Sequence, residues 1–132
     1  MASKKGLSAL KKKVHTVELN EYRTIVDQLG QFASDLSTQI LETDDISVHV
    51  EAGFRVNIGQ QFKIVLHVQT QTFRDILIRT YVPPTGYPVV VRFTGVERQA
   101  ENNNELVRIL YEEIPSNEGV QSRLQALLAL AG

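Results

Sequence analysis

Basic side chains on predicted β-strands are the residues of this chain best suited to bind a charged partner. Between Ile46 and Phe93 apolar and polar residues alternate, so each strand has one apolar and one polar face. Arginine on a polar face can hold a carboxylate or phosphate through paired N–H donors. We therefore expect a partner-binding face for an acidic protein, formed by Arg55, Lys63, Arg79, Tyr81 and Arg92.

The pairing of Arg79 with Arg92 follows from the parity of the last predicted hairpin. Inward residues must pair with inward residues, which sets Val82 opposite Val89 and Arg79 opposite Arg92. Two exposed like charges in that position repel by roughly a few tenths of a kcal/mol. A bound carboxylate would relieve the repulsion. The alternative is a solvated face on which the arginine stems only cover the sheet.

A lysine-rich start gives a second candidate site. Residues 1–15 predict a mobile basic arm, because few apolar residues accompany the positive charge. Together with the basic sheet face this arm could neutralise phosphates, so a nucleic-acid-associated protein is an alternative function. The single outward aromatic, Tyr81, is few for a sheet that reads RNA bases. The arm residues concerned are Lys4, Lys5, Lys11, Lys12 and Lys13.

The histidines of the first two predicted strands, His49 and His67, are candidate metal ligands. A turn there can set either Ile58 or Val56 opposite Phe62. Neither register puts His49 directly opposite His67, although the second makes them diagonal neighbours. A site would also need a third strong ligand, so we expect no metal and no cofactor.

Catalytic motifs are missing from the sequence. There is no cysteine, no glycine-framed serine and no glycine-rich phosphate loop. We expect a non-enzymatic protein-interaction module. A small-ligand-binding domain, with its pocket between sheet and helices, is a further alternative.

The elements that must position the basic face form an α+β domain. Apolar residues at helical spacing predict a helix over 17–41, and alternation predicts strands over 46–58, 62–68, 76–82 and 89–93. Two helices follow, one beginning after Asn102 and ending at Pro115, and one beginning at Ser116. We expect one domain over residues 16–132: an N-terminal helix, a four-stranded antiparallel meander and two C-terminal helices, all packed on one sheet face.

This element order, with Tyr87-Pro88 after the third strand, resembles that of ubiquitin-conjugating-like domains. The resemblance implies the same helix–meander–helix fold. It does not extend to conjugating activity, since that chemistry requires a cysteine and the chain has none.

Charge is unevenly distributed along the 132 residues, although the net charge is only −1. Residues 1–13 carry +5, residues 14–45 carry −6, residues 46–95 carry +3 and residues 96–132 carry −3. Acidic helices would complement a basic sheet face, so a homodimer is expected as one form of the interaction. No signal segment and no apolar run of roughly 18 residues is present, so we expect a cytoplasmic protein without membrane contact.

Overall fold

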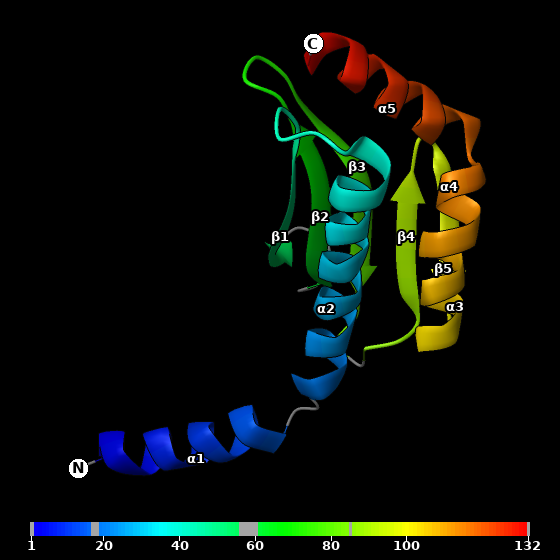
Figure 1. Ribbon diagram of the computed structural model, residues 1–132. Helices are drawn as coiled ribbons and strands as arrows, with labels where there is room; N and C mark the ends of the chain where they lie inside the picture. The colour runs from blue at the N-terminus through cyan, green and yellow to red at the C-terminus, as the bar shows by residue number, and fades with distance from the viewer. Residues whose placement is uncertain (1, 17–18, 56–60, 85, 132) are drawn as a thin grey trace.

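The computed structural model describes residues 2–16, 19–55, 61–84 and 86–131, and it has an α+β architecture (Figure 1). One antiparallel sheet has the strand order β1-β2-β3-β4-β5, and helices cover one of its faces. Its strands are β1 Ser47–Arg55, β2 Gln61–Gln69, β3 Arg74–Val82, β4 Val89–Phe93 and β5 Val96–Ala100.

The helical layer has two parts. The first is α2 (Leu19–Asp35), which continues into a π-helical segment, η1 (Leu36–Leu41). The second runs without a break through α3 (Asn103–Arg108), η3 (Ile109–Glu113) and α4 (Ile114–Ser116), and is followed by α5 (Glu118–Ala131). The predicted fold class is therefore confirmed in outline.

The core lies between these helices and the sheet. Ile25, Leu29 and Phe32 are 0–5% exposed and lie at the helical spacing that the sequence predicted for residues 17–41. They pack onto the inward strand positions, of which Ile64 and Val91 are both 0% exposed. The even-numbered residues of β2 thus face the helices, as the alternation predicted.

The sheet has one strand more than predicted. β5 pairs along β4, and the turn between them contains Thr94 and Gly95 with φ of 46° and 80°. Glu97, Arg98 and Gln99 are all exposed, so this edge strand lacks the apolar alternation on which the prediction relied. The four-strand expectation was wrong for that reason.

The register of the first hairpin differs from both predicted registers, which set Ile58 or Val56 opposite Phe62. Phe62 pairs with Phe54, and His67 therefore lies directly opposite His49. Residues 56–60 separate the paired ends and lie outside the described residues. Because the shift is an even number of residues, the faces of the strands stay as predicted.

A β-bulge interrupts the pairing of β2 with β3. Leu66 pairs with Ile78, but His67 pairs with Ile76, so Leu77 is an extra residue in β3. Leu77 and Ile78 are consecutive and yet only 2% and 0% exposed. Strict alternation along β3 therefore ends at Leu77, and Asp75 reaches the helical side of the sheet.

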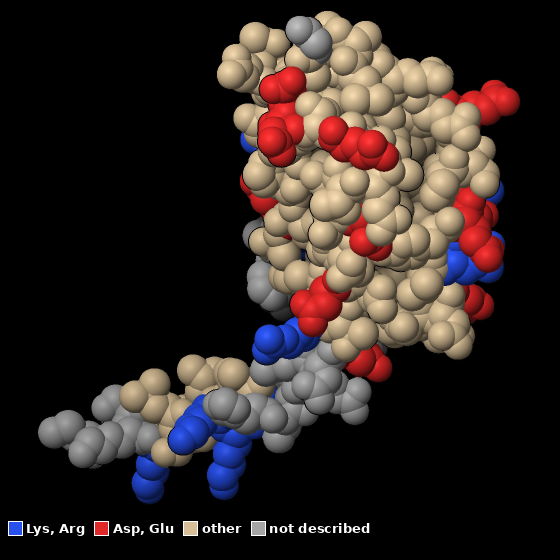
Figure 2. All heavy atoms as spheres, in the orientation of Figure 1, with Lys and Arg blue, Asp and Glu red and all other residues tan. Residues whose placement is uncertain are grey.

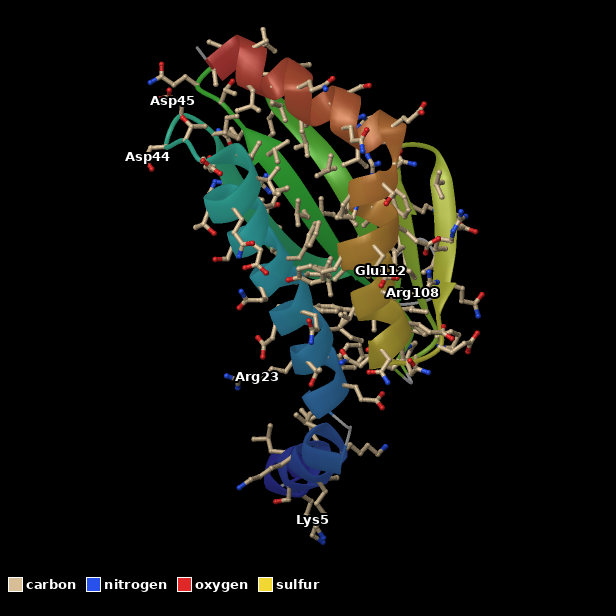
Figure 3. The ribbon with its side chains drawn as sticks, turned by 45° about the vertical axis from the view of Figure 1, so that its right-hand side comes forward. Lys5, Arg23, Asp44, Asp45, Arg108 and Glu112 are labelled. Atoms are coloured by element: carbon tan, nitrogen blue, oxygen red, sulfur yellow. The ribbon has the colours of Figure 1, made fainter. Side chains whose placement is uncertain are left out.

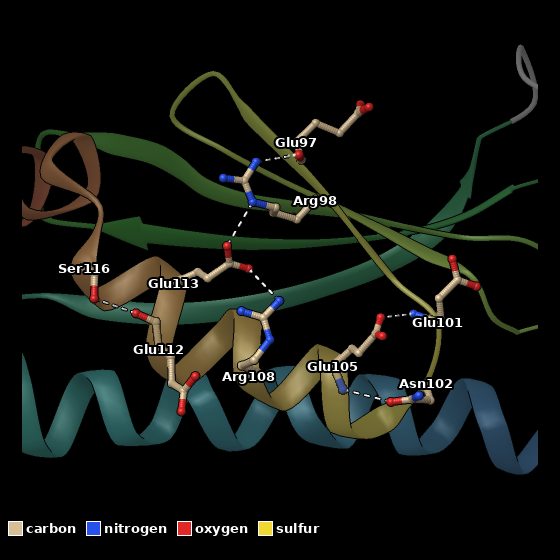
Figure 4. Close-up of polar contacts among 9 residues, drawn as sticks. All are labelled: Glu97, Arg98, Glu101, Asn102, Glu105, Arg108, Glu112, Glu113 and Ser116. Carbon is tan, nitrogen blue, oxygen red and sulfur yellow. Dashed lines mark hydrogen bonds and ion pairs between the residues drawn. The ribbon is translucent and has the colours of Figure 1, made fainter.

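Polar contacts attach the C-terminal helices to the edge of the sheet (Figure 4). Arg98 Nε donates to Glu113 Oε1 over 2.9 Å, and Arg108 Nη2 lies 3.3 Å from Glu113 Oε2. At the start of α3, Asn102 Oδ1 accepts a hydrogen bond from Glu105 N. This is the cap that the sequence predicted at Asn102.

The first helix, α1 (Ala2–Thr16), stands away from the domain (Figure 1). It occupies the segment for which a basic arm was predicted, and it is helical from Ala2 onward. Of the described residues, no helix has the length and apolarity that crossing a membrane would require.

Candidate anion-binding site

Helices cover one face of the sheet, and we call the opposite face the outer face (Figure 1). Lys63, Arg79 and Arg92 alternate along their strands with buried inward residues, so they lie on the outer face. Lys63 pairs with Tyr81 across β2 and β3, and Arg79 pairs with Arg92 across β3 and β4, as the parity predicted. Both arginines are exposed. Arg55 ends β1, and its side chain is not among those described.

The ring of Tyr81 is covered by neighbouring side chains and is not exposed to a partner. Lys63 Nζ lies 6.0 Å and Arg92 Cζ 5.1 Å from the centre of its ring, and Tyr81 is only 6% exposed. These are cation–π contacts, which hold the two basic side chains close to the sheet. Lys63, Tyr81 and Arg92 therefore come together, with the ring of Tyr81 beneath the two basic side chains.

Arg92 already has an anionic partner. Its Nε donates to Glu97 Oε1 over 2.6 Å, and this hydrogen bond raises the pKa of Arg92 above its usual value. Glu97 belongs to β5, the strand that was not predicted, so no sequence pattern indicated this pair.

Arg79 has no ion pair among the described residues. Its strand neighbour Arg92 is bound to Glu97, and the next arginine, Arg123, binds Asp75 over 3.1 Å. The carboxylates of Glu97 and Asp75 neutralise the charges of two of the three guanidinium groups. One positive charge, at Arg79, remains uncompensated.

These three arginines line one hollow, which we call the arginine pocket. It has a volume of about 320 Å³ and lies where β3 and β4 diverge. The two strands pair from Arg79 to Tyr81, and the bulge at Leu77 lies just before this paired part of β3. The lining consists of Ile76, Leu77, Arg79, Arg92, Phe93, Thr94, Gly95, Val96, Glu97 and Arg123.

Such a pocket suits a carboxylate or phosphate group. Guanidinium groups bind both anions through two parallel hydrogen bonds, and the volume is at the lower end of that of ligand pockets. Arg123 comes from α5, which the sequence placed in the helical layer. Its approach to the pocket depends on Asp75 having changed face at the bulge, and no local sequence pattern signals that.

The histidine pair does not form a metal site. The rings of His49 and His67 are 5.5 Å apart, and Glu51 Oε1 lies 3.3 Å from His67 Nε2. Arg74 Nη2, however, is 3.1 Å from the same His67 nitrogen, so a cation already fills the position between them. Within the described ranges no group of three or more acidic or histidine side chains could hold a metal ion.

The predicted nucleic-acid residues lie on a separate element. Lys5, Lys11, Lys12 and Lys13 are exposed on α1, while the side chain of Lys4 is not described. Because α1 leaves the domain at the start of α2, these lysines do not extend the basic surface of β3 and β4 (Figure 1).

Comparison with known proteins gave no match: no protein-family model, no curated protein and no solved structure matches the chain. The geometry of the site is therefore the basis for its interpretation.

Proposed function

We propose that this protein is a non-enzymatic interaction module that binds an acidic segment of a partner protein at the arginine pocket. The observation that carries the proposal is the uncompensated charge of Arg79 beside Arg92, at the mouth of a pocket of about 320 Å³. A partner carboxylate bound there would supply the anion that Arg79 lacks. It would also relieve the repulsion between the two arginines.

The test uses a hexaglutamate peptide titrated into the whole protein at low and high salt, with affinity and binding site followed by NMR. We expect binding that weakens as salt rises. Arg79→Glu should lower the affinity at least about tenfold, because a charge-assisted hydrogen bond is lost and repulsion is introduced.

The matched control is Arg23→Glu on α2. It makes the same change of charge at an exposed side chain whose only ion pair among the described residues is a 4.0 Å contact with Asp27. Equal weakening by both variants would reduce the effect to net charge and refute the site. Absence of binding at low salt would refute it as well.

The nucleic-acid alternative receives less support. Bases are usually read by stacking on exposed rings, and Tyr81 is only 6% exposed. A titration with single-stranded RNA and duplex DNA at two salt concentrations tests it. Binding that is strong at low salt and removed by Lys11→Glu plus Lys12→Glu would favour it.

A further inference from the structure

The first helix carries an exposed apolar stripe that its own domain does not cover. Leu7, Leu10 and Val14 follow at i, i+3 and i+7, and they are 65%, 55% and 48% exposed. At helical spacing Lys5 and Lys12 lie on the opposite face, together with Ser8 and Ala9. α1 is thus a short amphipathic helix with one apolar face and a basic opposite face.

An apolar groove of about 360 Å³ lies on the helical side of the domain. One wall is formed by Phe32, Leu36 and Ile40, which follow at four-residue intervals along α2 and η1. Ile114, Val120 and Leu124 form the other wall. Ile40 is 60% exposed, and the apolar surface continues along α5 to Leu128, which is 42% exposed.

The surroundings of the groove are acidic. Asp35 lies in its wall, where it accepts hydrogen bonds from Gln31 and from Tyr111. Figure 3 shows Asp44 and Asp45 in the loop beyond η1 and Glu112 on the facing helical segment. Figure 2 shows acidic side chains across this helical face and basic ones along α1.

We infer that α1 of one copy docks, apolar stripe inward, in the groove of a second copy, and that the exchange is reciprocal. Three properties match. The stripe and the wall are both apolar, the helix is basic where the surroundings are acidic, and their lengths agree. Leu7 to Val14 spans about 10 Å and Phe32 to Ile40 about 12 Å along the helix axis.

Docking within one copy does not satisfy the same geometry. Only residues 17 and 18 separate α1 from α2. Folded back antiparallel, α1 would set Val14 near Glu21 and Leu7 near Gln28, since two paired helices advance equally at 1.5 Å per residue. The stripe would then end before the groove begins at Phe32. A second copy has no such restriction, and reciprocal docking closes a two-fold dimer.

This inference goes beyond binding at the arginine pocket and uses different residues. Its test is sedimentation equilibrium of the full chain over a wide concentration range. We expect a dimer. Leu7→Asp plus Leu10→Asp should weaken it by at least about 100-fold, since the two docked helices together lose four buried leucines. Ser8→Asp plus Ala9→Asp adds the same charge on the opposite face of α1 and should weaken the dimer far less, because the apolar stripe stays intact.

The groove is tested in the same way. Ile40→Asp should weaken the dimer, whereas Ser34→Asp, at an exposed position of α2 outside the groove, should not. All six substituted positions are exposed, and circular dichroism confirms that each variant is folded. Mixing the stripe variant with Ile40→Asp should restore a heterodimer, because one intact stripe then meets one intact groove.

Several results would overturn the inference: a wild-type monomer at millimolar concentration, equal effects of stripe and control variants, or no heterodimer on mixing. Binding of a monomer through α1 to vesicles of phosphatidylcholine and phosphatidylserine would also overturn it. Arg79→Glu separates the two proposals, because it should weaken hexaglutamate binding and leave the dimer intact.

Discussion

Arg79 and Arg92 have the same side chain and the same strand register, yet their surroundings differ. Arg92 lies 2.6 Å from Glu97 and covers the ring of Tyr81, so its charge is neutralised and its stem is packed. Arg79 has no carboxylate among the described residues. Parity identified the pair, and only the contacts of the folded chain distinguish the two members. The free guanidinium is the one that a partner would use.

Tyr111 is the residue whose titration the structure alters most. Burial, followed by the 2.7 Å hydrogen bond to Asp35 Oδ2, raises the pKa of its phenol from 10.0 to about 12. A raised pKa in the folded state stabilises the protein fully below pH 10, and this contribution is lost as the pH rises from 10 to 12.

Ultraviolet titration should therefore show one tyrosine ionising near pH 12, and Tyr111→Phe should remove that transition. Asp35→Asn should shift it toward lower pH, because the carboxylate that opposes ionisation is gone. The control Asp27→Asn should leave it in place. An unchanged titration in the Asp35 variant would contradict the assignment.

At the scale of elements, the start of α3 depends on one side chain. Asn102 Oδ1 accepts from Glu105 N over 2.9 Å and so satisfies a backbone donor that the helix leaves unpaired. Asn102→Ala should lower the free energy of unfolding by about 1 kcal/mol. Urea denaturation measures this, with Asn104→Ala as the matched control. The control should lose no stability, because alanine has the higher helix propensity inside α3. Equal losses in both variants would contradict the capping role.

The strands show where pattern reasoning succeeds and where it stops. Alternation identified four strands and the inward faces of Ile64 and Val91, because burial on one side imposes a period of two. Alternation missed β5, because an edge strand with polar residues on both faces does not show this period of two. It also missed the bulge at Leu77, which adds a residue without a glycine or proline to mark it.

At the scale of the whole molecule, we expect the free energy of unfolding of the domain not to depend on α1. The buried core extends from Ile25 to Leu127, and no described residue of α1 belongs to it. Deletion of residues 2–16 should change the free energy of unfolding by less than about 0.5 kcal/mol at micromolar concentration. Thermal denaturation tests this. A clearly lower midpoint that is the same at every protein concentration would mean that α1 packs on its own domain, since loss of a dimer would make the midpoint depend on concentration.

The candidate site was only partly accessible to prediction. Arg79 and Arg92 share a face through local parity, which the sequence expresses directly. Glu97, Asp75 and Arg123 reach the same pocket through an edge strand, a bulge and a distant helix. None of those three placements is encoded in neighbouring residues.

Periodicity in the chain determined the helix that runs from α2 into η1, four of the strands, and the faces of β2, of β4 and of β3 beyond the bulge, because these are local consequences of burying apolar side chains. Long-range packing alone decided which charges meet. A side chain finds its ionic partner across elements that are far apart in sequence, and the distance between them is set by the fold. The uncompensated guanidinium of Arg79 is the outcome of that packing.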